Sequence, residues 1–346
     1  MDSRFVYVLA FATRGKLLER RALEDLADSR TLEDLVTALR ATHYSEAVSE
    51  LPLPVTARRV ELALRRYLYR YHHSLVKYTS WNPALVALFE RYVVRELKAA
   101  VRGIASGKTV DEVTREVDLT PAELLGVRDV IARAVASRSA TELRQALRGT
   151  KYEAPVGSAL DYFERTGDPA AIDVEFDKSI AGSLSSSIRA LRWPDRRWVR
   201  WMLERYINSF VVEAVLRAKA WRLEPGEVRR AIEGLEHGIP RPVMEVLLES
   251  LEAEAISRAL QLVEGRSLPR LTERLSLTAM ASQLRERAWR DLVSRAKRTF
   301  LVTDSHLALA VASVFLLEDE VARVTSIATG IEMGLRKEEI LEVALF

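Results

Sequence analysis

The chain has 346 residues, of which 48% are hydrophobic and 29% are charged, and its 52 basic and 49 acidic residues leave a net charge of only +3. This balance is ordinary for a soluble globular protein and gives no reason to expect that bulk charge draws it to nucleic acid. The absence of cysteine excludes disulfides, thiolate metal sites and cysteine nucleophiles.

Apolar residues recur at helical spacing in nearly every segment, and no segment shows the sustained alternation of a strand. Thr31 is predicted to begin one helix and Asn82–Pro83 a longer one, while Thr120 begins a third whose apolar residues between 124 and 135 fall on one face. The apolar stretch 307–317 is too short to cross a bilayer, which needs about 20 residues, and predicts a buried helix. The first residues lack a basic segment followed by an apolar one, so no secretory leader is expected. The sequence therefore predicts an all-α protein.

Gly107-Lys108-Thr109 has the ending of a phosphate-binding loop. That motif requires an earlier glycine where this chain has Arg102, and it follows a strand, whereas the residues before Gly107 have helical spacing. We therefore expect Gly107 to end one helix in a left-handed turn and Thr109 to cap the next helix together with Glu112.

The titratable residues show no pattern typical of a catalytic site. General acid–base chemistry needs carboxylates that converge in a shielded cleft, and pairs such as Asp173 and Asp177 have basic residues interspersed around them. Solvated helix faces are the simpler interpretation of these acids. The neighbouring His72 and His73 would point about 100° apart on a helix, so surface or partly packed histidines are expected rather than metal ligands. We predict no catalytic residue, no cofactor and no metal site.

Parts of the chain repeat. Residues 38–44 return as residues 146–152 with Ala, Leu, Arg, Thr and Tyr in register, and residues 99–107 are echoed by residues 322–330 at about twice that separation. Three diverged copies of one helical unit explain both echoes, and such an architecture favours a scaffold over a catalyst. The predicted helical modules, with approximate boundaries, are residues 1–115, 116–235 and 236–346.

Residues 192–201 stand out, because four arginines and three tryptophans lie within them. These residue types anchor protein interfaces, and they also suit contact with anionic lipid headgroups or stacking on nucleic-acid bases. The alternative is that Trp198 and Trp201 belong to a core while the arginines point into water. The predicted interaction surface consists of Arg192, Trp193, Arg196 and Arg197.

Several segments resemble one known family. Residues 5–18 resemble the opening of the C subunit of archaeal A-type ATP synthases, the counterpart of the d subunit of the vacuolar ATPase. Residues 39–44 resemble its first helix–turn signature, and residues 320–330 and 334–340 resemble its last helix and terminal turn. The resemblance implies a funnel of three similar helical modules around a pseudo-threefold axis.

The resemblance also implies a function that is mechanical and non-catalytic. As a central-stalk component of the rotor, the chain would couple the shaft, formed by the D and F subunits, to the membrane ring of proteolipid (c/K) subunits during ion-driven ATP synthesis or ATP-driven ion pumping. A transient contact with the a/I stator subunit and a peripheral place on the cytoplasmic face of the cell membrane would follow, and no nucleic acid would be bound.

The alternative function is that of a helical-repeat adaptor that binds protein or RNA. A peptide-binding solenoid would form an open superhelix, and an RNA binder would need a continuous basic groove.

Overall fold

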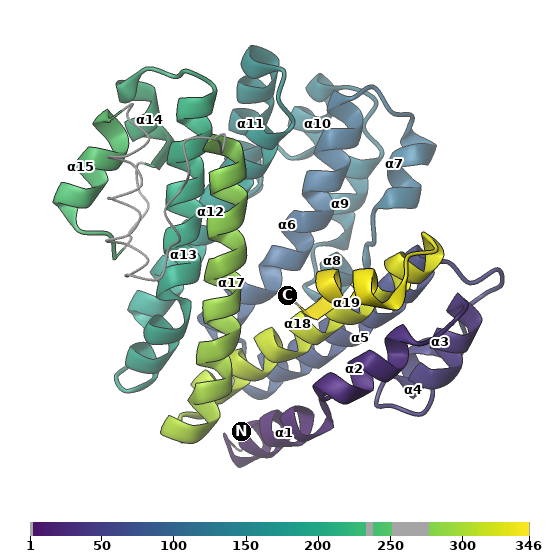
Figure 1. The fold of residues 1–346 in the computed structure, drawn as a ribbon. Helices are drawn as coiled ribbons and strands as arrows, with labels where there is room; N and C mark the ends of the chain where they lie inside the picture. Colours follow the sequence, from purple (N-terminus) through teal and green to yellow (C-terminus); the bar gives the residue numbers. More distant parts are fainter. Residues whose placement is uncertain (1–2, 233–237, 251–276, 346) are drawn as a thin grey trace. The chain divides into compact units, whose positions relative to one another are not determined.

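The computed structural model describes residues 3–232, 238–250 and 277–345, and every regular element within these ranges is an α-helix (Figure 1). The all-α prediction is confirmed for them. Contacts divide the chain into two compact units, each assembled from more than one segment of the chain. Unit 1 comprises Met1–Phe89, Thr120–Gly126 and Arg295–Phe346, and unit 2 comprises Glu90–Leu119 and Val127–Ser294. Two of the four borders fall inside long helices, α6 (Pro83–Ala105) and α17 (Leu277–Val302), and the other two lie on either side of residues 120–126.

Unit 1 is organised around α18 (His306–Glu332), which is apolar on every side over residues 307–317. A helix of this kind has to be surrounded by others, and all of these residues are buried, as the sequence predicts. The helices that pack against α18 are α1 (Ser3–Lys16), α2 (Arg20–Ala27), α3 (Leu32–Leu39), α5 (Ala57–Tyr78) and α19 (Lys337–Leu345). Two short helices, α4 (Ser45–Val48) and α8 (Thr120–Leu124), lie against α5. No helix in the described ranges has the length and hydropathy needed to cross a membrane.

The predicted helix starts have their expected chemistry. Thr31 and Asp34 form a reciprocal capping box at the start of α3, in which each side chain accepts from the other's backbone N–H. At the start of α6, the side chain of Asn82 accepts a hydrogen bond of 3.0 Å from the backbone N–H of Ala84. Both contacts satisfy donors that the first helical turn leaves without partners.

The segment with the ending of a phosphate-binding loop is a helix–helix junction, as predicted. Gly107 follows α6 with φ of +75°, in the left-handed region that favours glycine. Thr109 and Glu112 form the capping box of α7 (Val110–Glu116).

The prediction of one continuous helix from Thr120 through residue 135 is wrong. Gly126 adopts φ of +76° and separates α8 from α9 (Arg128–Val135). Helical spacing continues across this glycine in the sequence, but the left-handed backbone ends the first helix there.

Unit 2 contains a succession of antiparallel helices. The helices α11 (Glu153–Thr166), α12 (Ala170–Ala190), α13 (Asp195–Ala220) and α14 (Pro225–Ile232) each pack against the next. Like α18, α13 is buried on nearly every side over residues 206–219. The remaining helices of the described part are α10 (Ala140–Ala146) and α15 (Arg241–Glu249).

The sequence repeat has a structural counterpart, with one copy in each unit. After α3 the hydroxyl of Thr42 donates to the carbonyl of Leu39 at 2.7 Å and accepts from the backbone N–H of Tyr44. After α10 the hydroxyl of Thr150 makes the same two bonds within its turn, the first of them at 2.6 Å. The tyrosine that follows each threonine is buried. Two segments with the same sequence signature therefore have the same local structure.

A carboxylate from a long helix lies against each repeated turn. Glu320 of α18 accepts a 2.8 Å hydrogen bond from the Tyr44 hydroxyl in unit 1. In unit 2, Glu90 pairs with Lys151, and burial together with the charge of Glu90 raises the pKa of Tyr152. Two related modules explain this correspondence. The three modules and their boundaries stay a prediction, and part of the third lies outside the described residues.

Candidate interaction surface

The predicted interaction surface lies at the turn that joins α12 to α13 in unit 2. The chain leaves α12 after Ala190 in an extended conformation, and α13 begins at Asp195, whose negative charge suits a helix N-terminus. Val199, Met202 and Leu203 of α13 are buried, which fixes the orientation of the helix. The first turn of α13 therefore presents its other side to solvent.

All four residues of the predicted surface are exposed. Trp193 has 73% of its surface exposed, and the side chains of Arg192, Arg196 and Arg197 are exposed to solvent as well. An indole this exposed keeps most of its contact with water on folding, so that apolar surface is available for burial against a partner. Exposure meets the first requirement for an interface, and the partner stays a prediction.

The two other tryptophans of this segment are half-buried. Trp198 and Trp201 meet edge to face, with ring centroids 6.0 Å apart, and the Arg197 guanidinium lies 5.3 Å from the centre of the Trp198 ring. The interpretation of these two tryptophans as core residues is therefore only half right. The ring of Trp198 supports the position of Arg197 through a cation–π contact.

A hollow of about 130 Å³ opens beside this turn, and Arg196 lines it. Arg189 and Arg200 contribute two further guanidinium groups, and Glu204 contributes a carboxylate that lies 3.5 Å from Arg200. One carboxylate beside three arginines gives the hollow a positive balance. It extends the basic character of the turn inward from the exposed surface.

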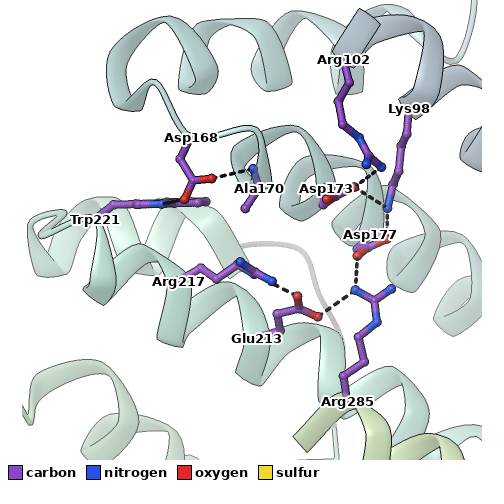
Figure 2. A network of polar contacts seen from close by, with 10 residues as sticks. All are labelled: Lys98, Arg102, Asp168, Ala170, Asp173, Asp177, Glu213, Arg217, Trp221 and Arg285. Carbon is purple, nitrogen blue, oxygen red and sulfur yellow. Dashed lines mark hydrogen bonds and ion pairs between the residues drawn. The ribbon is translucent and has the colours of Figure 1, made fainter. Parts of the chain in front are cut away.

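A network of charged residues, partly buried, joins α6, α12, α13 and α17 in unit 2 (Figure 2). Its centre is Asp177 of α12, which is 6% exposed. Asp177 pairs with Lys98 of α6 on one side and with Arg285 of α17, at 2.9 Å, on the other. Three helices thus meet at one carboxylate.

The network continues from both partners of Asp177. Arg285 also reaches Glu213 of α13 at 2.9 Å, and Glu213 pairs with Arg217 one turn further along α13. On the other side, Asp173 lies 3.5 Å from Lys98 and 2.8 Å from Arg102. A further hydrogen bond joins the start of α12 to the end of α13. Asp168, which precedes α12, accepts from the indole N–H of Trp221, which follows α13, at 2.6 Å.

The interpretation of the acidic pairs as solvated helix faces is wrong for Asp177, which is 6% exposed. Glu213 and Glu320, each 4% exposed, are buried as well. The basic partners of Asp177 come from α6 and α17, so only the tertiary structure reveals the pairing. The spacing of Asp173 and Asp177 by one helical turn is the sole signal in the sequence that both acids share a face.

Two acids of α12 have opposite shifts of their pKa values. Burial tends to raise the pKa of Asp177, but the positive charges of Lys98 and Arg285 outweigh it and lower the value. Burial raises the pKa of Glu175, which Lys178 offsets only in part. The partners of Asp177 therefore favour its ionised form, whereas burial disfavours the ionised form of Glu175.

His72 is packed more tightly than the sequence predicts. It is fully buried, with Nε2 3.1 Å from the carbonyl oxygen of Leu85, while His73 is 8% exposed. Both histidines belong to the interior of unit 1. Among the described residues, no three His, Asp or Glu side chains are arranged to hold a metal ion. What the geometry around the α12–α13 turn offers is an exposed, basic and aromatic surface.

Comparison with known proteins relates nearly the whole chain to one family. Residues 8–343 match the profile of a family described as ATP synthase (C/AC39) subunit. The C subunit of the A-type ATP synthase from Methanocaldococcus jannaschii is 24% identical over 223 residues, which cover 62% of this chain and 54% of that protein. The C subunit of the A-type ATP synthase from Thermococcus onnurineus is 27% identical over 151 residues, covering 43% and 39% respectively. The aligned part thus spans about half or less of these relatives' length.

Proposed function

Since the chain belongs to the ATP synthase (C/AC39) subunit family, we propose that it is the central-stalk component of a rotary ATPase that joins shaft to ring. In this position it couples the shaft, formed by the D and F subunits, to the proteolipid ring of the membrane sector. Its task is to transmit torque, and the chemistry of ATP and the movement of ions belong to other subunits. It acts as a peripheral component on the cytoplasmic face of the membrane.

The observation that carries the proposal is the match of the family profile to nearly the whole chain, from residue 8 to residue 343. The threonine–tyrosine turn that recurs in both units agrees with a body built from copies of one module. We extend this to three modules around a pseudo-threefold axis, which form a funnel between shaft and ring.

The interior of unit 2 suits a part that carries torque. Close-packed helices resist deformation, and ion pairs at 2.9 Å join α12, α13 and α17. We place one of the contacts with other subunits at the surface formed by Arg192, Trp193, Arg196 and Arg197. A transient contact with the stator fits the same peripheral position.

Affinity purification from the native host tests this function. The tagged chain is recovered from gently solubilised membranes, and the proteins and nucleic acids that accompany it are identified. We expect the D and F subunits and the proteolipid. Recovery of RNA or of soluble adaptor complexes, without any component of a rotary ATPase, would contradict the proposal.

A further inference from the structure

Unit 1 exposes large apolar side chains at the neighbouring ends of three helices. They come from the start of α1, from the end of α5 and the turn after it, and from the end of α17, and each has between 38% and 75% of its surface exposed. We call this set the apolar band. Its members are Phe5, Tyr7, Val8, Tyr78, Trp81, Leu301 and Val302.

Contacts between rings show that the ends of these helices lie close together. Phe5 packs against Tyr78 with ring centroids 4.3 Å apart, which joins α1 to the end of α5. On the other side of α1, Tyr7 meets His306 at 5.8 Å, and Phe11 meets Phe300 at 5.1 Å. Helix α1 thus connects the end of α5 with the α17–α18 turn.

Trp81 is displayed by an unusual backbone. Ser80 and Trp81 have φ of 55° and 58°, in the left-handed region that residues with a side chain rarely adopt. Despite this strain, 48% of the Trp81 surface is exposed, with one edge against His73. Strain that places a large aromatic group in solvent is typical of a functional contact.

Basic residues surround the apolar band. Lys77 precedes Tyr78, and Lys297 and Arg298 lie one turn before Leu301 and Val302 on α17. Arg4 precedes Phe5. All four basic side chains are exposed, and Asp304 is the exposed acid of the same segments. The band therefore combines aromatic and aliphatic groups with a positive rim.

We propose that the apolar band docks on the headgroup layer of an anionic lipid bilayer. Aromatic rings prefer the membrane–water interface, and lysine and arginine next to them interact with lipid phosphates. The surface around Trp193 is also basic, but it offers one exposed large apolar side chain where the band offers seven. Since binding at an interface grows with the apolar area that is buried, we assign the lipid contact to the band. The inference rests on the proposed function only for the presence of a membrane.

Co-sedimentation of the purified full-length chain with lipid vesicles tests the inference. Vesicles of phosphatidylcholine with about a third phosphatidylglycerol are compared with vesicles of phosphatidylcholine alone, at low and at high salt. We expect binding to the anionic vesicles that weakens as salt rises. Trp81 supplies a second readout, because the fluorescence change on binding should shrink in Trp81→Phe.

Two sets of variants locate the contact. Phe5→Ser combined with Trp81→Ser should lower the partition coefficient at least about tenfold, because two interfacial rings are lost. Lys297→Glu combined with Arg298→Glu should abolish the preference for anionic vesicles. Circular dichroism verifies that each variant is folded.

A matched control uses two apolar residues of unit 1 outside the band. Met333 and Val343 are 68% and 67% exposed, so the double serine variant removes as much exposed apolar surface. Its binding should stay within about twofold of the original chain. A general effect of surface hydrophobicity would lower binding in the control as well and would overturn the inference.

Three further results would overturn it: no binding to anionic vesicles at low salt, unchanged binding in the Phe5 and Trp81 variant, or loss of binding in Trp193→Ser instead. Binding to a detergent-solubilised proteolipid ring without binding to vesicles would assign the band to protein and would also contradict the inference. The vesicle assay uses the isolated chain and the affinity purification uses host membranes. Failure of one is therefore distinguishable from failure of the other.

Discussion

At the scale of single residues, Asp177 is the buried centre of the ion network in unit 2. It is buried and has cationic partners from two other helices. Asp177→Asn should lower the free energy of unfolding of unit 2 by about 2 kcal/mol, because it removes the carboxylate that Lys98 and Arg285 share and leaves each with one acidic partner. Five of the six tryptophans lie in unit 2, so denaturant unfolding followed by tryptophan fluorescence measures this change.

The exposed Asp161, paired with Arg144, is the control, and Asp161→Asn should cost less than about 1 kcal/mol. Equal losses in the two variants would show that burial of the network does not matter.

The opposite pKa shifts of Asp177 and Glu175 predict opposite effects of pH. The pKa of Asp177 is lower in the folded chain than its ordinary value of 3.8, so its stabilising effect is present above that value and is lost as pH falls through the folded pKa. Asp177→Asn should therefore flatten the acid limb of the stability curve.

The pKa of Glu175 is raised by burial above its ordinary value of 4.5, so ionisation of this residue opposes folding at neutral pH. Glu175→Gln should stabilise unit 2 at pH 7, with a gain that shrinks as pH falls toward about 4.5 and is absent at lower pH. Unfolding curves at pH 4 and pH 7 provide the comparison. A loss of stability at pH 7 would contradict the assigned environment of Glu175.

At the surface, Trp193 and Arg196 are expected to act together in binding. Trp193→Ser combined with Arg196→Glu should reduce the recovery of rotary-ATPase subunits about tenfold, since buried tryptophan and arginine side chains dominate interfaces. Arg241, whose side chain is 92% exposed elsewhere in unit 2, provides the control variant Arg241→Glu. Quantitative recovery from host membranes measures both. Unchanged recovery in the double variant would remove these residues from the interface.

At the scale of elements, the similarity of the two repeated turns predicts that equivalent substitutions in them have equal effects on stability. Thr42 and Thr150 each bond the last turn of a short helix and the N–H of a buried tyrosine. Replacing either by alanine should cost about 1 kcal/mol of stability in its own unit, because two hydrogen bonds are lost in a partly buried turn. Replacement by serine keeps the hydroxyl and should cost much less. Thermal unfolding followed by circular dichroism compares the four variants. A cost at one turn and none at the other would argue against equivalent modules.

Local chemistry explains which elements the sequence reveals. The capping boxes at Thr31 and Thr109 and the glycine turn at Gly107 depend on neighbours within one helical turn, so the sequence alone predicts them. Gly126 breaks a helix where apolar spacing continues, and spacing alone cannot signal a left-handed residue.

The buried ion network escapes sequence-based prediction because its partners are distant in the chain. Lys98, Asp177 and Arg285 meet only once α6, α12 and α17 have packed. The exposed cluster at the α12–α13 turn was accessible to prediction, since its unusual composition lies within ten residues. The apolar band was not, because its members come from three separate segments.

At the scale of the whole molecule, the central claim is that this chain turns with the rotor. The natural absence of cysteine allows a single cysteine to be placed at position 193 and cross-linked within the purified complex. A covalent link to the shaft or to the proteolipid ring should leave ATP-driven ion pumping intact, because the linked parts rotate together.

ATP-driven ion pumping after this site-specific cross-link is the measurement that tests the claim most directly. We predict retained pumping when the link joins the chain to the shaft or the ring, and arrested pumping when it joins the chain to the stator. Arrest by a link to the ring or the shaft would show that the chain stands still while they turn, and would contradict its assignment to the rotor.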